Sequence, residues 1–146
     1  MASLRQQQDR PDEVVQYLEP ALAFYQQGGY RSETVSCLAL LARANLQKGD
    51  YAAADKGLEE LSRLAQESND QSLIAQAHAE RGSALIREEK FTEALDHLNQ
   101  AYSIYNSQGI PRSMGYNLAS RGEVLGRLGR FVEAKALLDQ ASGYRQ

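Results

Sequence analysis

Several features that mark common protein classes are missing or scarce in this sequence. A single cysteine, Cys37, excludes an intramolecular disulfide and disfavours a cysteine-based metal site. No apolar run approaches the roughly 18 residues of a membrane span, and residues 1–8 lack the apolar core of a signal peptide. We therefore expect a cytoplasmic protein that has no membrane partner.

Positive charge is also in short supply. The 146 residues include 16 Lys and Arg against 19 Asp and Glu, which gives a net charge of −3. A chain with this balance has no basic field to attract nucleic-acid phosphates, so we expect no nucleic-acid partner. Tryptophan is absent and proline occurs three times, which suits a mostly helical chain.

Residue types that carry catalysis or bind metals do not form a recognisable set. His78 and His97 lack the i,i+4 spacing of a helical metal pair, so structural or surface roles are expected for both. Cys37 lies on an apolar stripe, which is typical of an unreactive core thiol. No phosphate-binding loop and no nucleophile with its base can be found. We expect no enzymatic activity, no cofactor and no metal.

What the sequence does contain is a repeat. The aromatic residues Tyr51, Phe91 and Phe131 follow one another at intervals of 40 residues, each at the start of a helix-like segment. Gly49 and Gly129 stand two residues before the first and the last of them. A fixed period in this range indicates stacked helical units. Within such a unit, Tyr51 and Phe91 are expected on the buried face.

Helical periodicity predicts an all-α fold of about seven helices. Apolar residues recur three and four positions apart, and no useful stretch alternates with a period of two. Pro11 suits a first helical turn. The predicted helices span residues 11–27, 32–48, 51–67, 72–88, 91–106, 112–128 and 131–141.

Small residues recur at two registers of the repeat. Gly82 and Gly122 lie inside predicted helices, where glycine costs about 1 kcal/mol relative to alanine, so a compensating close contact is expected. Ala94 and Ala134, near the start of the following helices, would form the other side of that contact. The sequence therefore predicts a joint within each helix pair that is too narrow for a larger side chain.

These features resemble the tetratricopeptide repeat family, whose pattern places a small residue and then an alanine at fixed points of a helical hairpin. Residues 118–125, the corner at 129–134 and residues 134–138 carry the resemblance, which extends over residues 11–143. The repeat is longer than the family's usual length of about 34 residues. Long repeats of this sort are similar to those in sensor and scaffold regions of large bacterial signalling proteins.

The resemblance implies a right-handed α-solenoid of antiparallel helix hairpins. We expect one domain over residues 1–146, with a partial unit at 1–31 and full units at 32–71, 72–111 and 112–146. HEAT-like hairpins, which have a similar period, are the alternative fold. Neither end has the polar capping helix that a solenoid needs. We therefore expect a fragment of a longer array, or ends that pair with other chains.

In this family the first helix of each unit lines a concave groove, which implies where a partner binds. Arginine and tyrosine are enriched at binding hot spots. Transferred by position, the expected partner-binding residues are Arg43, Gln47, Gln76, Ser83, Arg87, Tyr116, Glu123 and Arg127. The family's clamp for a peptide carboxylate needs lysine and asparagine at positions that here hold Ala39, Arg43, Glu80, Tyr116 and Ser120. Carboxylate clamping is therefore not expected.

Two arginines depart from the family pattern. Arg81 and Arg121 stand where the family carries an apolar residue. We expect their stems to pack and their charged ends to reach solvent or a nearby glutamate, with an anion-binding role as the alternative.

The resemblance implies a non-catalytic scaffold that binds a protein or peptide segment in its groove. The first alternative is a sensor segment of a larger bacterial signalling or transcription-regulating protein. The second is a homotypic assembly unit that uses its uncapped ends.

Overall fold

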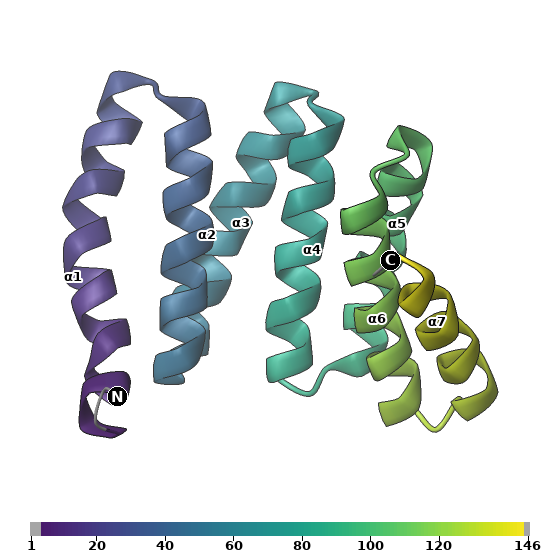
Figure 1. The fold of residues 1–146 in the computed structure, drawn as a ribbon. Helices are drawn as coiled ribbons and strands as arrows, with labels where there is room; N and C mark the ends of the chain where they lie inside the picture. Colours follow the sequence, from purple (N-terminus) through teal and green to yellow (C-terminus); the bar gives the residue numbers. More distant parts are fainter. Residues whose placement is uncertain (1–3, 145–146) are drawn as a thin grey trace. The chain divides into compact units, whose positions relative to one another are not determined.

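A computed structural model confirms the all-helical fold. It describes residues 4–144, with side chains from Arg10 onward, so residues 1–3 of the expected partial unit lie outside it. This part of the chain forms seven helices and no strand (Figure 1). The helices are α1 (Leu4–Gly28), α2 (Arg31–Lys48), α3 (Tyr51–Ser68), α4 (Gln71–Arg87), α5 (Phe91–Gln108), α6 (Pro111–Arg127) and α7 (Phe131–Gly143).

The first helix begins earlier than the sequence predicted. α1 starts at Leu4 and runs through Pro11 and Pro20, so the prediction that Pro11 opens this helix is wrong. A proline inside a helix loses one backbone hydrogen bond, and packing must offset that loss. Here α1 packs on α2 through a shared core made of Val15, Leu18, Cys37, Leu41 and Ala44.

Every connection between helices contains one residue in the left-handed conformation. At the α2–α3 corner this residue is Gly49, with φ +82°, and the next residue, Asp50, donates its N–H to the carbonyl of Asn45 at 2.8 Å. That bond closes the helix end and reverses the chain. The left-handed residues lie twenty positions apart: Gly29, Gly49, Asn69, Glu89, Gly109 and Gly129.

The chain divides into two compact units, Met1–Glu67 and Ser68–Gln146. In the first, α1 packs on α2, and α3 follows them. In the second, α4 packs on α5, α5 on α6 and α6 on α7. Ala94, Leu98 and Val124 form a fully buried core at the α5–α6 contact.

The predicted narrow joint is present in both hairpins of the second unit. A Cβ atom on Gly82 would lie 2.8 Å from the Leu98 side chain and 3.6 Å from the carbonyl oxygen of Ala94. A Cβ atom on Gly122 would lie 2.8 Å from the Leu138 side chain. Real side chains do not approach this closely, so glycine permits the close contact at these two positions.

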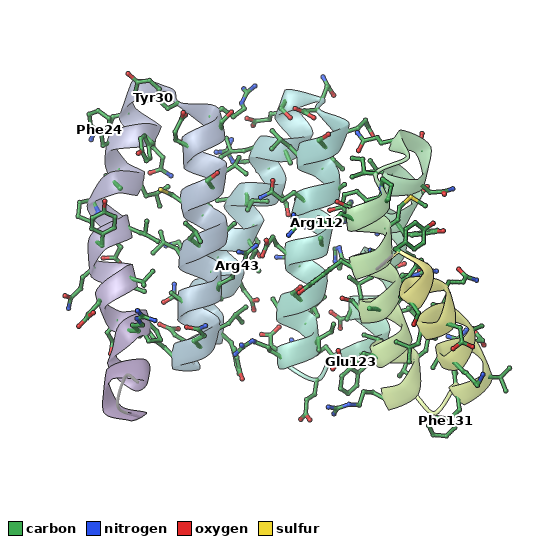
Figure 2. The ribbon with its side chains drawn as sticks, viewed as in Figure 1. Phe24, Tyr30, Arg43, Arg112, Glu123 and Phe131 are labelled. Atoms are coloured by element: carbon green, nitrogen blue, oxygen red, sulfur yellow. The ribbon has the colours of Figure 1, made fainter. Side chains whose placement is uncertain are left out.

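The aromatic residues that mark the repeat are buried to different degrees. Phe91 is partly buried against the α5–α6 core, as expected. Tyr51, expected on the buried face, is 41% exposed, so that prediction is wrong. Phe131 is 71% exposed and lies at the start of α7 (Figure 2). Phe91 differs because α6 packs alongside α5 and brings Arg127 over its ring.

None of the helices within residues 4–144 combines the length and apolar character that a membrane crossing requires.

Candidate functional site

A hollow of about 220 Å³ opens among three helices of the second unit. Two of them, α4 and α6, are the first helices of their hairpins, which the family resemblance assigned to partner binding. The third, α5, supplies the floor. The lining residues are Ala79 and Ser83 from α4, Leu98 and Tyr105 from α5, and Arg112, Ser113, Tyr116, Asn117 and Ser120 from α6.

Two of the predicted partner-binding residues meet at this hollow. Ser83 and Tyr116 both line it, although they come from different hairpins. Tyr116 is 79% exposed and shares the lining of the hollow with the buried Leu98. Arg112 precedes Tyr116 by one helical turn and is also exposed. Figure 2 shows Arg112 in the first turn of α6.

The floor of the hollow is fixed by a buried amide. Asn117 is 4% exposed, and its Nδ2 group donates a hydrogen bond to the carbonyl oxygen of Leu98 at 3.0 Å. This bond ties α6 to α5 where the two helices form the floor. The Oδ1 atom of Asn117 is also buried and has no hydrogen-bond donor among the described residues. A buried acceptor of this kind costs free energy, so the tether to Leu98 must offset part of that cost.

One cation and several neutral hydroxyl groups surround the floor. Burial raises the pKa of the Tyr105 phenol, and the charge of Glu80 raises it further. Tyr105 therefore stays protonated at neutral pH and can donate a hydrogen bond. Arg112 supplies the positive charge. The arrangement can hold an apolar group on the floor and a carboxylate at the rim, whereas it contains no nucleophile next to a base.

The other predicted partner-binding residues lie outside this hollow, and their role stays a prediction. Those on the second unit are Gln76, Arg87, Glu123 and Arg127; Gln76 is half-buried and the rest are exposed (Figure 2 labels Glu123). Arg43 and Gln47 are exposed on α2, in the first unit. The guanidinium of Arg127 lies 5.8 Å from the centre of the Phe91 ring, a cation–π contact at the α4–α5 corner.

The two histidines, which the sequence treated separately, form a pair. Nδ1 of His78 on α4 lies 3.0 Å from Nδ1 of His97 on α5, and both rings are half-buried. Nineteen residues separate them, so no helical spacing rule could find the contact. Their place within one helix hairpin supports the structural role that was expected.

Arg121, one of the two family-atypical arginines, makes contacts that the sequence did not predict. Its Nε donates to the Oδ1 atom of Asn99 at 2.8 Å, and its guanidinium lies 4.6 Å from the centre of the Tyr102 ring. The charged end thus contacts an amide and an aromatic face on α5. Burial lowers the pKa of Arg121, although the group stays charged.

Cys37 occupies the core position that its apolar stripe predicted. Its side chain is 5% exposed, and it belongs to the α1–α2 core. Burial raises the pKa of the thiol, which lowers its reactivity.

Sequence reasoning missed Arg112, Tyr105 and Asn117. Arg112 could have been found, because it precedes Tyr116 by four residues and so shares its helix face. Tyr105 lies on α5, and its access to the hollow depends on the angle between α5 and α6. Asn117 fell between predicted groove positions, and only the structure shows its bond to Leu98.

No protein-family model matches this sequence, and no curated protein matches it. Similar solved structures exist. BtubC (BKLC) from P. vanneervenii is 19% identical with a TM-score of 0.82, over 93% of this chain and 57% of that one. The apo form of RapI is 20% identical with a TM-score of 0.79, over 89% of this chain and 36% of that one. These likenesses support the helical-repeat, tetratricopeptide-like fold, and the chain spans only part of either structure.

Proposed function

We propose that this chain is a non-catalytic module that binds a peptide or protein segment in the hollow among α4, α5 and α6. The observation that carries the proposal is Tyr116. It is 79% exposed at an apolar concavity, where a partner would bury it. Aromatic residues at the centre of an interface contribute much of the binding energy, because they bury a large area with few rotatable bonds.

The lining suggests how a bound segment would lie. An apolar side chain of the segment would rest on Leu98 and be covered by Tyr116. An acidic group would pair with Arg112 at the rim, where a guanidinium can bind a carboxylate with two hydrogen bonds. The serine hydroxyls would pair with the peptide backbone. The preferred ligand is thus a segment in which an apolar residue neighbours an acidic one.

The remaining predicted residues would extend this site. Gln76 and Arg87 on α4, and Glu123 and Arg127 on α6, follow the same pair of helices beyond the hollow. They would contact residues that flank the anchored side chain. Arg43 and Gln47 would serve the corresponding face of the first unit.

A peptide library displayed on phage and selected against the whole chain tests this proposal. We expect enriched peptides that place an aspartate or glutamate next to a large apolar residue. Their affinity should fall at least tenfold for Tyr116→Ala and for Arg112→Glu, and should be unchanged for Tyr17→Ala. Tyr17 is the matched control, because it is a tyrosine on α1 that is 78% exposed. Peptides that bind all three variants with the affinity of the parent would refute the site.

Two finer roles would use the same module. If the chain is a regulatory segment of a larger protein, binding of a peptide would tighten the packing among α4, α5 and α6. Amide hydrogen exchange over residues 71–127 measures that change. A homotypic assembly unit would show a molar mass that rises with concentration in sedimentation experiments.

A further inference from the structure

A second and larger hollow, of about 760 Å³, lies in the first unit among α1, α2 and α3. Its floor is apolar and comes mainly from α2, through Leu38, Leu41 and Ala42. α1 and α3 form its two walls. None of the residues of the proposed peptide site lines it, so it would be a separate interaction surface.

The repeat provides an internal comparison for this hollow. The equivalent place two periods later lies among α5, α6 and α7, where the free space is about 240 Å³. There Leu125 and Leu137 line the groove, at the positions that hold Asn45 and Gly57 in the first unit. Leucine side chains of the chain itself therefore narrow the groove among α5, α6 and α7, whereas the groove of the first unit lacks these two side chains.

Nothing within the first unit replaces the missing side chain. A Cβ atom added to Gly57 would meet no atom within 4 Å, although Gly57 lines the hollow. Asn45 is half-buried at the same place and brings an amide to the floor that Leu38, Leu41 and Ala42 form. An apolar floor of this kind with polar groups around it is a usual form of binding site.

The rim of the hollow carries more negative than positive charge. Its acidic residues are Glu19, Glu59 and Glu60, and its basic residues are Lys56 and Arg63. Arg63 and Glu60 are paired with each other through the Nε of Arg63 at 3.1 Å, and the Nη1 of Arg63 donates to Glu67 at 2.8 Å. Glu19 and Glu59 then remain against Lys56 on the rim. A partner with basic residues beside its apolar anchor is therefore complementary to this rim.

We propose that this hollow docks an amphipathic helix of a partner protein that inserts a leucine-sized side chain over Gly57 and places lysine or arginine against the acidic rim. The inserted side chain takes the place that Leu137 occupies in the second unit. The hollow is a groove between α1 and α3 with α2 as its floor. An amphipathic helix commonly binds in such a groove by placing its apolar face on the floor.

The probe is an alanine-based helical peptide with one central leucine and a lysine one turn to each side. It is titrated into the ¹⁵N-labelled full chain, and the amide shifts of Gly57 and the side-chain amide of Asn45 are followed. Saturable shifts at both groups are expected. Replacing the leucine of the peptide by alanine should weaken binding at least tenfold, and replacing the lysines by glutamate at least threefold.

Gly57→Leu is the decisive variant, because it adds the side chain that the first unit lacks. It should abolish the shifts while its melting temperature stays at or above that of the parent. Gly126→Leu is the matched control, since a Cβ on Gly126 also meets nothing within 4 Å and the residue lies on α6; it should bind as the parent does.

Absent shifts in the parent, or unchanged binding by Gly57→Leu, would overturn the proposal. Equal binding of the lysine and glutamate peptides would overturn the basic character of the partner. Binding that Tyr116→Ala abolishes and Gly57→Leu spares would assign the probe to the peptide site of the second unit.

Discussion

His78 and His97 share a hydrogen bond between their Nδ1 atoms, which are 3.0 Å apart, within the α4–α5 hairpin. One Nδ1 must donate and the other accept, so the bond requires that the accepting ring be neutral. Burial lowers the pKa of both imidazoles. His97 lowers the pKa of His78 further, and the charge of Arg81 lowers the pKa of His97 further. Asp96 opposes these shifts for both rings.

The histidine pair predicts that the second unit loses stability in weak acid. The folded imidazoles have pKa values below the ordinary 6.5, so below that pH the unfolded chain binds more protons and the free energy of unfolding falls. Each histidine contributes a slope of at most about 1.4 kcal/mol per pH unit. Urea unfolding between pH 8 and pH 5 should show this slope in the parent. His78→Leu/His97→Leu should flatten it, and parallel curves would contradict the prediction.

Gly82→Leu should destabilise the α4–α5 hairpin by about 1–3 kcal/mol or more, because the new side chain collides with Leu98 at the joint. Leu98 is 3% exposed and belongs to the α5–α6 core, so the collision falls inside packed structure. Gly126→Leu is the control, since open space surrounds its Cβ position; it should be neutral, or stabilising by less than about 1 kcal/mol. Thermal unfolding of both variants decides the matter, and equal melting temperatures would count against the narrow joint.

Glu89→Gly should stabilise the chain by about 0.5–1 kcal/mol. Glu89 adopts φ +60°, a left-handed conformation that is strained for a residue with a side chain, whereas Gly49 and Gly129 adopt it without strain at the equivalent corners. The reciprocal change, Gly129→Glu, imposes the same conformation on a residue with a side chain at φ +79° and should cost a similar amount. Chemical denaturation of the pair measures both effects. Shifts of the same sign would show that corner conformation does not govern them.

Arg121 and Asn99 should be coupled energetically, because the guanidinium donates to the amide while it lies over Tyr102. A double-mutant cycle of Arg121→Ala and Asn99→Ala is expected to give a coupling of about 0.5–1 kcal/mol. Arg121→Lys should not restore it, because a lysine lacks the planar group that stacks on the ring. Additive single effects, within about 0.3 kcal/mol, would exclude the interaction.

The helices and their corners could be predicted from sequence because they depend on local chemistry. Gly49, Gly109 and Gly129 mark helix ends, and each adopts the left-handed conformation there. Gly82 and Gly122 also revealed the close joint, since an interior helical glycine is costly without a packing reason. The start of α1 could not be predicted, because Pro11 was assumed to open the helix and the packing that carries α1 through it is tertiary.

The candidate site could be predicted only in part. Ser83 and Tyr116 were found because the repeat gives their register along α4 and α6. The contribution of α5, through Tyr105 and Leu98, depends on how two helices cross, and the residue pattern along one helix does not contain that angle. The pairing of His78 with His97 was missed for the same reason.

The uniform corners have a consequence for proteolysis. Connections of two or three residues separate the seven helices of residues 4–144, and at the corners of Gly29, Gly49, Glu89, Gly109 and Gly129 a backbone bond ties the left-handed residue or its neighbour to the preceding helix. Proteases cut most readily in exposed, flexible loops, and a connection this short offers no such stretch. Cleavage must therefore wait until a helix unfolds, so the rate of limited digestion at each site should report the local stability of the helices on either side.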